Sequence, residues 1–226
     1  MKRVRYGILV AQVMVVSACV LGGATENSER VPLELEFPRP FFVGTPVPVK
    51  LPHLEAPRDG KRPDFLVPAG VTNLGRGAAV TSSDAHPIFG ELAYVTDGDK
   101  SGGDGTIVEL APELQWVQID LGRSARLFAI VCWHFHSEPR AYHDVIVQVS
   151  GDPEFKEDVR TLFNNDHDNS AGLGRGSDPA YIGTFEGRLI DAKGEKARYL
   201  RLYSNGSTAD ELNHYTEVEV YGLPEG

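Results

Sequence analysis

Short stretches in which apolar and polar residues alternate fill the chain after residue 71, and turns rich in glycine, aspartate and asparagine separate them. In residues 115–121, Val117 and Ile119 fall on one side of an extended backbone and Gln118 falls on the other. A period of two is typical of a strand with one buried face. The same alternation recurs in three later stretches, residues 145–149, 198–203 and 217–221.

Residues 127–133 form a more continuous apolar run, which fits a central strand covered on both faces. No long stretch with the helical spacing of apolar residues competes with these strands. Many short strands without helices predict an all-β fold, in which two sheets pack face to face with Greek-key or jelly-roll connections.

The segment before these strands is rich in proline, because nine of the chain's 15 prolines lie within residues 31–68. Proline has no amide hydrogen to donate and resists both helices and central strands, so we expect an extended, polyproline-like arm. Phe37, Phe41 and Phe65 are nevertheless spread along it. Two interpretations stay open, namely a floppy stalk and an arm of which residues 41–68 pack across the domain surface.

The N-terminus has the parts of a secretion signal. Three positive charges occur within the first five residues, and residues 8–16 are apolar apart from Gln12. That apolar stretch is too short to span a bilayer. Residues 16–19, Val-Ser-Ala-Cys, resemble a bacterial lipobox, which implies cleavage before Cys19 and acylation of its thiol and new amine. The alternative is an ordinary signal peptide cut near residues 22–24.

Lipidation at Cys19 predicts a bacterial cell-envelope protein that is held to the membrane by its lipid anchor alone. Val20 rather than aspartate follows the cysteine, which by analogy with lipoprotein sorting permits transfer to the outer membrane, with the periplasmic face as the other location. The predicted organisation is a signal peptide over residues 1–18, a proline-rich tether over residues 19–68 and a β-sandwich domain over residues 69–226.

The charge balance excludes several partners. Lysine and arginine total 22 against 32 aspartates and glutamates, which gives a formal net charge of −10 at pH 7. Such a surface repels nucleic-acid phosphates and anionic lipid headgroups, so neither is expected as a direct partner. Acidic loops do suit hard cations such as calcium. The two cysteines, Cys19 and Cys132, predict no internal disulfide, because Cys19 has another use.

Six stretches in a fixed order carry a resemblance to a known family. The most specific are residues 197–203, Ala-Arg-Tyr-Leu-Arg-Leu-Tyr, and residues 217–222, Glu-Val-Glu-Val-Tyr-Gly. Together the six resemble the discoidin domain, also called the coagulation factor V/VIII type C domain, over residues 73–222. The resemblance implies a galactose-binding-like jelly-roll β-sandwich of about eight main strands, with ligands bound by loops at one end. The other four stretches are residues 73–83, 95–99, 115–122 and 145–150.

Members of this family recognise glycans, phospholipid headgroups or proteins. Phospholipid-binding members use apolar spikes and basic residues on their loops, whereas the corresponding loops here are acidic and rich in glycine, asparagine and aspartate. We therefore expect a glycan as the ligand, with a protein of the envelope as the alternative partner.

The resemblance also implies a structural calcium site. Glycan-binding members often hold calcium with an Asp-Gly-Asp or Asp-Gly-Asn loop and the glutamate that opens the last strand, and Asp97, Asp99 and Glu217 occupy the matching positions. Thr106, in the loop that follows, is a looser match. Calcium takes roughly six to eight hard oxygens, several of them from backbone carbonyls. In the alternative interpretation, residues 97–98 are only a turn and Glu217 is an edge charge.

The stretch between two central strands, residues 133–144, carries the chemistry that a sugar site needs. Planar donors and acceptors bind hydroxyl groups, and an aromatic face covers the apolar side of a sugar ring. Two further residues, just before the last strand, can line the same end of the sandwich. The candidate ligand-binding residues are His136, Arg140, Tyr142, His143, Asn213 and His214.

Other interpretations of these loops stay open. On a strand, His134 and His136 would share one face and could chelate zinc. In the plainest alternative, the segment is a structural loop whose histidines cap it or face solvent. Residues 164–172, rich in asparagine and aspartate, suit a turn-forming loop that shapes the binding face, or a second cation site.

The sequence contains no nucleophile elbow, zinc-protease motif or phosphate-cradling glycine loop. In the family that it resembles, the domain is typically an accessory to a catalytic partner, so we expect no enzyme activity. The predicted function is a non-catalytic binding module at the cell envelope that recognises carbohydrate through loops at one end. The alternative is a protein-interaction or structural module.

Overall fold

The computed structural model describes residues 1, 29–42, 49–58, 60–103 and 105–225. Cys19 and nearly all of the predicted signal peptide lie outside these residues. Within the described part of the chain, no helix has the length and apolar character needed to cross a membrane.

Strands make up nearly all of the regular structure of the described residues, and the one helical element is a short 3-10 helix, η1 (Leu92–Thr96). In chain order, the strands are β1 (Arg30–Pro32), β2 (Leu66–Pro68), β3 (Thr72–Asn73), β4 (Ala79–Ser82), β5 (Val108–Leu110), β6 (Gln115–Trp133), β7 (Ile146–Ser150), β8 (Arg160–Asn164), β9 (Arg188–Ser204), β10 (Asn213–Tyr215) and β11 (Glu217–Pro224).

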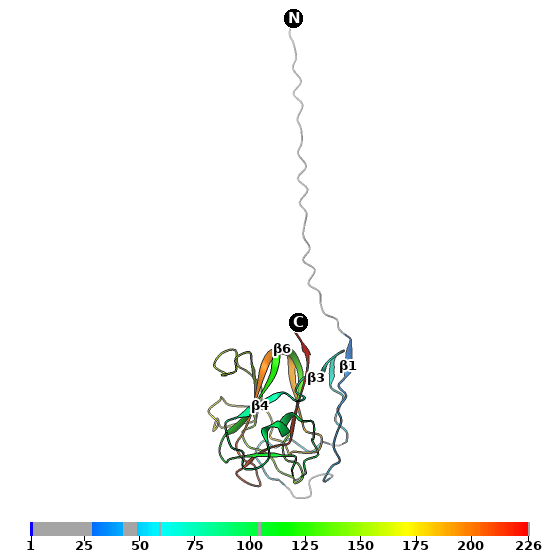
Figure 1. Ribbon diagram of the computed structural model, residues 1–226. Helices are drawn as coiled ribbons and strands as arrows, with labels where there is room; N and C mark the ends of the chain where they lie inside the picture. Colours follow the sequence, from blue (N-terminus) through cyan, green and yellow to red (C-terminus); the bar gives the residue numbers. More distant parts are fainter. Residues whose placement is uncertain (2–28, 43–48, 59, 104, 226) are drawn as a thin grey trace.

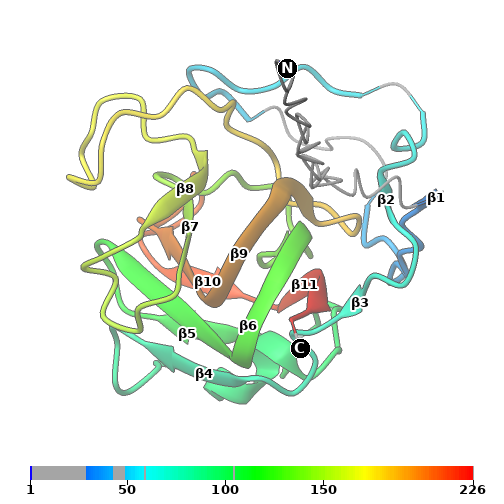
Figure 2. The same ribbon diagram turned by 90° about the horizontal axis from the view of Figure 1, so that it is seen from above.

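One antiparallel sheet forms most of the domain, in the order β3-β11-β6-β9-β7-β8, and β4 pairs with the first half of β6. The neighbours β6 and β9 are long strands that run side by side through the middle of the molecule (Figure 2). The first half of β6 lies between β4 and β9, and its second half lies between β11 and β9. The predicted strands at residues 115–121 and 127–133 are therefore two halves of one bent strand.

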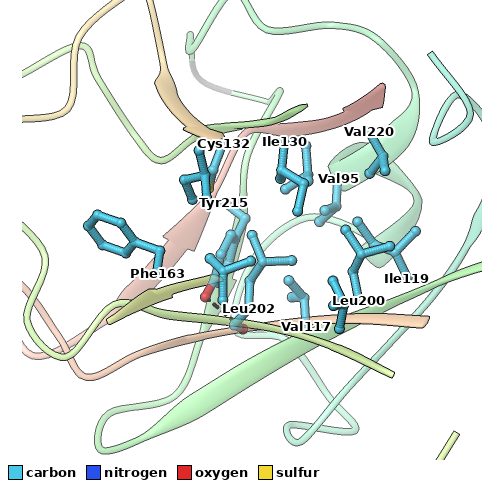
Figure 3. Close-up of a cluster of buried hydrophobic side chains, with 14 of the residues drawn as sticks. Val95, Val117, Ile119, Ile130, Cys132, Phe163, Leu200, Leu202, Tyr215 and Val220 are labelled. Carbon is cyan, nitrogen blue, oxygen red and sulfur yellow. Dashed lines mark hydrogen bonds between the residues drawn. The ribbon is translucent and has the colours of Figure 1, made fainter. Parts of the chain in front are cut away.

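The alternating apolar residues meet in one core, as the all-β prediction requires (Figure 3). Val117 and Ile119 of β6 and Leu200 and Leu202 of β9 are almost completely buried. Burial of an aliphatic side chain of this size contributes about 1.5–3 kcal/mol. Cys132 lies in the same cluster as a free thiol. The prediction of an all-β sandwich is confirmed. The apolar residues that alternate along β6 and β9 are the ones that contact one another in the core.

Part of the proline-rich arm lies against the outer face of the main sheet. β1 pairs with β2, and the amide of Leu33 donates to the carbonyl of Phe65 at 2.7 Å. Leu33, Leu35 and Phe65 pack on a second apolar cluster that contains Trp133 and Tyr221. The described arm residues therefore add a partial third layer over β6 and β11.

Farther along, polar contacts join the arm to the segment before β9. The amide of Glu55 donates to the carbonyl of Ala180 at 2.8 Å, and the amide of Ala180 donates to the carbonyl of His53 at 3.0 Å. The guanidinium of Arg62 donates to the carbonyl of Glu186 at 3.0 Å. These bonds connect positions that lie more than a hundred residues apart in the chain.

The start of β1 and the C-terminus lie at the same end of the sandwich (Figure 1). Near that end, the amide of Glu225 donates to the carbonyl of Ser124 in the bend of β6 at 3.2 Å. Trp133 and Glu217 pair at the opposite end, where β6 finishes and β11 begins. The loops that follow β6 and precede β11 therefore lie away from the start of β1.

Candidate functional site

Four loops meet beside Trp133, and hydrogen bonds between them fix their positions. The amide of Asn205 donates to the carbonyl of His143, and the amide of Gly183 donates to the carbonyl of Arg140, both at 3.0 Å. Loops that are tied to one another in this way form a preorganised surface. We call this surface the loop end, and it comprises residues 97–103, 105–107, 134–145, 165–187 and 205–212.

Arg140 is the polar centre of the loop end. Its side chain, 6% exposed, donates from Nη2 to Glu138 at 2.9 Å and from Nη1 to Asp210 at 2.7 Å. The guanidinium also lies over the ring of Phe135, 4.8 Å from the ring centroid. Glu138 and Asp210 keep 67% and 37% of their side-chain surface exposed. Arg140 therefore fixes two solvent-facing carboxylates, which offer acceptors for hydroxyl groups.

A buried network of tyrosine and histidine rings supports this loop. The Tyr142 hydroxyl donates to His214 Nδ1 at 3.1 Å, and His214 Nε2 donates to the Glu109 carboxylate at 3.1 Å. His134 stacks on Tyr142 with ring centroids 4.2 Å apart, and its Nδ1 donates to the carbonyl of His214 at 2.8 Å. Burial lowers the pKa of His134 to about 4, so this ring is neutral at neutral pH.

Asn213 ties the 205–212 loop to the segment after β5. Its Nδ2 donates to the carbonyls of Ala111 and Glu113 at 2.8 and 2.9 Å, and its Oδ1 accepts from the amide of Gly206 at 2.9 Å. The side chain is completely buried. Asn213 therefore holds the loop end together from inside.

The two remaining histidines of the predicted site differ in exposure. His143 is half-buried at the loop surface, whereas His136 is buried, with Nε2 3.0 Å from the carbonyl oxygen of Lys100. The alternative in which His134 and His136 share one face of a strand is wrong, because β6 ends at Trp133.

The six predicted ligand-binding residues all lie in or beside the loop end, but burial gives them different roles. Tyr142 and His214 bond to each other within the protein and support the loops, as Asn213 does. Ligand contact by any of the six stays a prediction. Sequence reasoning missed Glu138 and Asp210; Glu138 lies two positions from the arginine in the sequence, whereas nothing in the sequence connects Asp210 to it.

The two segments of the predicted calcium site meet where β11 begins. The amide of Gly98 donates to Glu217 Oε2 at 2.9 Å. The carboxylate of Asp97 accepts from the amide of Asp99 at 2.7 Å, and the carboxylate of Asp99 accepts from the amide of Ser101 at 2.9 Å. These hydrogen bonds shape residues 97–101 into a compact turn against β11.

The environment of the Glu217 side chain suits a bound cation. Its side chain is completely buried, and Oε1 has no hydrogen-bond partner among the described residues. Burial raises the pKa of this carboxyl to about 8. A hard cation would satisfy the orphan oxygen, and the residues present therefore fit calcium. Thr106 donates to the carbonyl of Gly103 at 2.9 Å within its own loop, and among the described residues no hydrogen bond joins it to Glu217.

A second group of carboxylates converges on the loop end and can hold a metal ion. Ligand atoms of Asp144, Asp166 and Asp168 all lie within 4.8 Å of one another. Ser170 Oγ and Asn205 Nδ2 donate to Asp144 Oδ2 at 2.9 and 2.8 Å. Asp166 and Asp168 belong to the acidic loop in which the sequence allows a second cation, whereas Asp144 comes from a separate loop and was missed.

No protein-family model matches the chain, and no curated protein matches it. Among solved structures, it is similar to a family 89 glycoside hydrolase from Clostridium perfringens, with a TM-score of 0.52 and 17% identity over 68% of this chain and 15% of the hydrolase chain. It is also similar to the CBM32 of AlyQ in complex with 4,5-unsaturated mannuronic acid, with a TM-score of 0.46 and 18% identity over 63% of this chain and 92% of that chain. A Streptococcus pneumoniae fucose binding module matches with a TM-score of 0.48 and 16% identity over 66% of this chain and 97% of that module.

At these identities the likeness concerns the fold. The chain has the galactose-binding-like, or discoidin-like, β-sandwich fold that the six sequence stretches predict.

Proposed function

We propose that the protein is a non-catalytic carbohydrate-binding module that takes a glycan at its loop end. The observation that carries the proposal is Arg140, held between the exposed carboxylates of Glu138 and Asp210. Sugar hydroxyls donate readily to carboxylates in fixed positions, and such charge-assisted hydrogen bonds are stronger than neutral ones. The loops are already tied together, so binding orders little additional chain.

The contacts of Glu138 and Asp210 with Arg140 favour glycan binding rather than glycan hydrolysis as the role of these two carboxylates. A glycosidase needs one carboxyl group that carries a proton for the leaving group. Glu138 and Asp210 instead both accept hydrogen bonds from one guanidinium. This arrangement holds them as acceptors, which is the role that recognition of hydroxyl groups requires.

The proposal includes a structural calcium ion. Glu217 would hold it together with oxygens of the turn at Asp97 and Asp99, because the buried Glu217 Oε1 lacks a partner among the described residues. The ion would supply positive charge to a carboxylate that burial otherwise penalises. It would also tie the turn at residues 97–101 to the start of β11, next to the loop end.

The proposal also places the protein at the bacterial cell envelope, anchored through Cys19. The sequence Val-Ser-Ala-Cys at residues 16–19 supports this location. The start of β1 lies at the opposite end of the sandwich from Trp133, so a chain anchored upstream of Arg30 presents its loop end away from the anchor (Figure 1).

A protein-interaction module is the second candidate. Ile88 and Phe89 are neighbours with 57% and 48% of their surface exposed, and adjacent exposed apolar residues favour protein contacts. Pull-down from envelope fractions distinguishes the two candidates. A protein partner that is retained in excess free sugar and lost in Phe89→Ser supports this alternative.

A glycan array probed with the full chain tests the proposed function. We expect retention of at least one plant, algal or host glycan by the wild type. The Glu138→Gln/Asp210→Asn double variant should weaken this retention by about tenfold or more, because two charge-assisted hydrogen bonds are lost. Glu154→Gln, which neutralises a carboxylate 69% exposed in the turn after β7, is the matched control and should bind like the wild type. Equal retention by wild type and double variant would contradict the proposal.

A further inference from the structure

A groove of about 660 Å³ lies between the proline-rich arm and the outer face of the main sheet. Two arm segments, residues 32–37 and 61–65, form one side, and side chains of β11 and of the turn after η1 form the other. Small-molecule sites in proteins commonly measure about 300–1,000 Å³. The groove therefore has room for a short oligosaccharide.

Buried polar groups lie on the sandwich side of this groove. Lys100 Nζ pairs with Glu219 Oε1 at 2.5 Å, and the Tyr221 hydroxyl donates to Glu219 Oε2 at 2.8 Å. The ammonium also lies over the ring of Trp133, 4.9 Å from its centroid. An ammonium carries three N–H donors, so Lys100 keeps donor capacity for a hydroxyl group in the groove.

The arm supplies aromatic surface. Phe37 is 38% exposed, and Phe65 packs at the base of the arm on the Tyr221 cluster. Both side chains line the groove. An aromatic face beside hydrogen-bonding groups is the combination that binds the two sides of a sugar ring, one apolar and one polar.

The charges around the groove select among glycans. Glu34, Glu36 and Asp64 are exposed acidic side chains on its arm side, and Lys61 is the exposed basic one. The other cation in the arm-side lining, Arg62, is already bound to backbone carbonyls beside β9 and lies 5.8 Å from the centroid of the Phe37 ring. The acidic excess repels carboxylate and sulfate groups and attracts ammonium groups.

We propose that this groove is a second glycan site, selective for neutral or amino-substituted oligosaccharides. It is built jointly by the arm and the sandwich, and its existence does not depend on binding at the loop end. Phe37 provides the apolar platform, Lys100 and Glu219 bind hydroxyl groups, and Glu36 binds an ammonium or hydroxyl group.

Calorimetric titration of the full chain tests the proposal, with three probes: the trimers of glucosamine, N-acetylglucosamine and galacturonic acid. Phe37→Ala is expected to weaken binding of the first two about tenfold, which is the scale of one aromatic contact. Glu36→Gln should weaken the glucosamine trimer more than the N-acetylglucosamine trimer. Leu66→Ala removes an apolar side chain of the arm that is 46% exposed and does not line the groove, so it should bind like the wild type.

The loop-end double variant Glu138→Gln/Asp210→Asn separates this site from the proposed function. Binding that depends on Phe37 should persist in the double variant. If the double variant alone abolishes all binding, the groove proposal fails and the loop end stands. If Phe37→Ala alone abolishes binding of the first two trimers, the groove stands, and the glycan array decides separately whether the loop end binds. Binding of the galacturonic acid trimer at the groove, or no effect of Phe37→Ala with any trimer, would also overturn the proposal.

Discussion

Glu217 is the residue whose burial has the clearest energetic consequence. Its pKa is raised to about 8 by burial, so the folded state holds its proton more tightly than the unfolded chain does. The favourable contribution of the protonated form is complete below about pH 4.5 and is lost as the pH rises through about 8. Each unit of pKa shift corresponds to about 1.4 kcal/mol, so the loss amounts to a few kcal/mol.

Replacement of this residue separates the burial penalty from calcium binding. Glu217→Gln is expected to raise the melting temperature of the calcium-free protein at pH 8, because the amide carries no charge to bury. The same variant should lose the stabilisation of about 2.7 kcal/mol that calcium at a hundredfold its Kd gives a protein that binds it. Thermal unfolding at pH 5 and pH 8, with calcium or with chelator, measures both effects. A calcium-induced rise in the variant equal to that of the wild type contradicts this role.

Residue types alone did not reveal which polar side chains face solvent. Tyr142, Asn213 and His214 have the chemistry of a sugar site, and they use it on other protein groups. The same donors and acceptors serve both purposes, so only burial separates a support network from a binding surface. Glu138 and Asp210 have no distinctive sequence signal of their own, because their importance comes from Arg140, which lies two positions from Glu138 but 70 from Asp210.

Among the elements, the start of the arm contains a strand-like alternation that its high proline content made hard to recognise. Val31, Leu33 and Leu35 alternate with Pro32 and Glu34, and the apolar members are the less exposed ones. This is the period of a strand, and the segment begins in β1. The docking interpretation covered residues 41–68, where Phe65 does pack on the Tyr221 cluster, but it left out Leu33 and Leu35.

Removing the apolar side of this segment tests how firmly the arm is held. Leu33→Ala/Leu35→Ala is expected to cost about 1–2 kcal/mol per site, since both side chains are only partly buried. Trypsin should then cleave the arm of the full chain several-fold faster at Lys61. Glu34→Ala, on the exposed side of the same segment, is the matched control and should keep the wild-type rate. Equal cleavage of the double variant and this control would show that the leucine contacts do not retain the arm.

At the scale of the whole molecule, alternation of apolar residues was enough to predict the sandwich. Val117 and Ile119 reach the core as their spacing requires. The bend that joins both halves of β6 was not predictable, because it depends on register shifts near Asp120 and Ala125 that only the paired strand defines. The loop end likewise joins four segments from distant parts of the chain, and their contacts follow from the complete fold.

Mapping of backbone amide chemical shifts shows directly whether a glycan binds at the loop end. The isotope-labelled full chain is titrated with the glycan that the array retains most strongly. Binding at the loop end predicts saturable shifts concentrated in residues 134–145 and 205–212. Shifts confined to the turn at residues 151–158 or to the surface around Ile88 and Phe89, with the loop end unchanged, would contradict it.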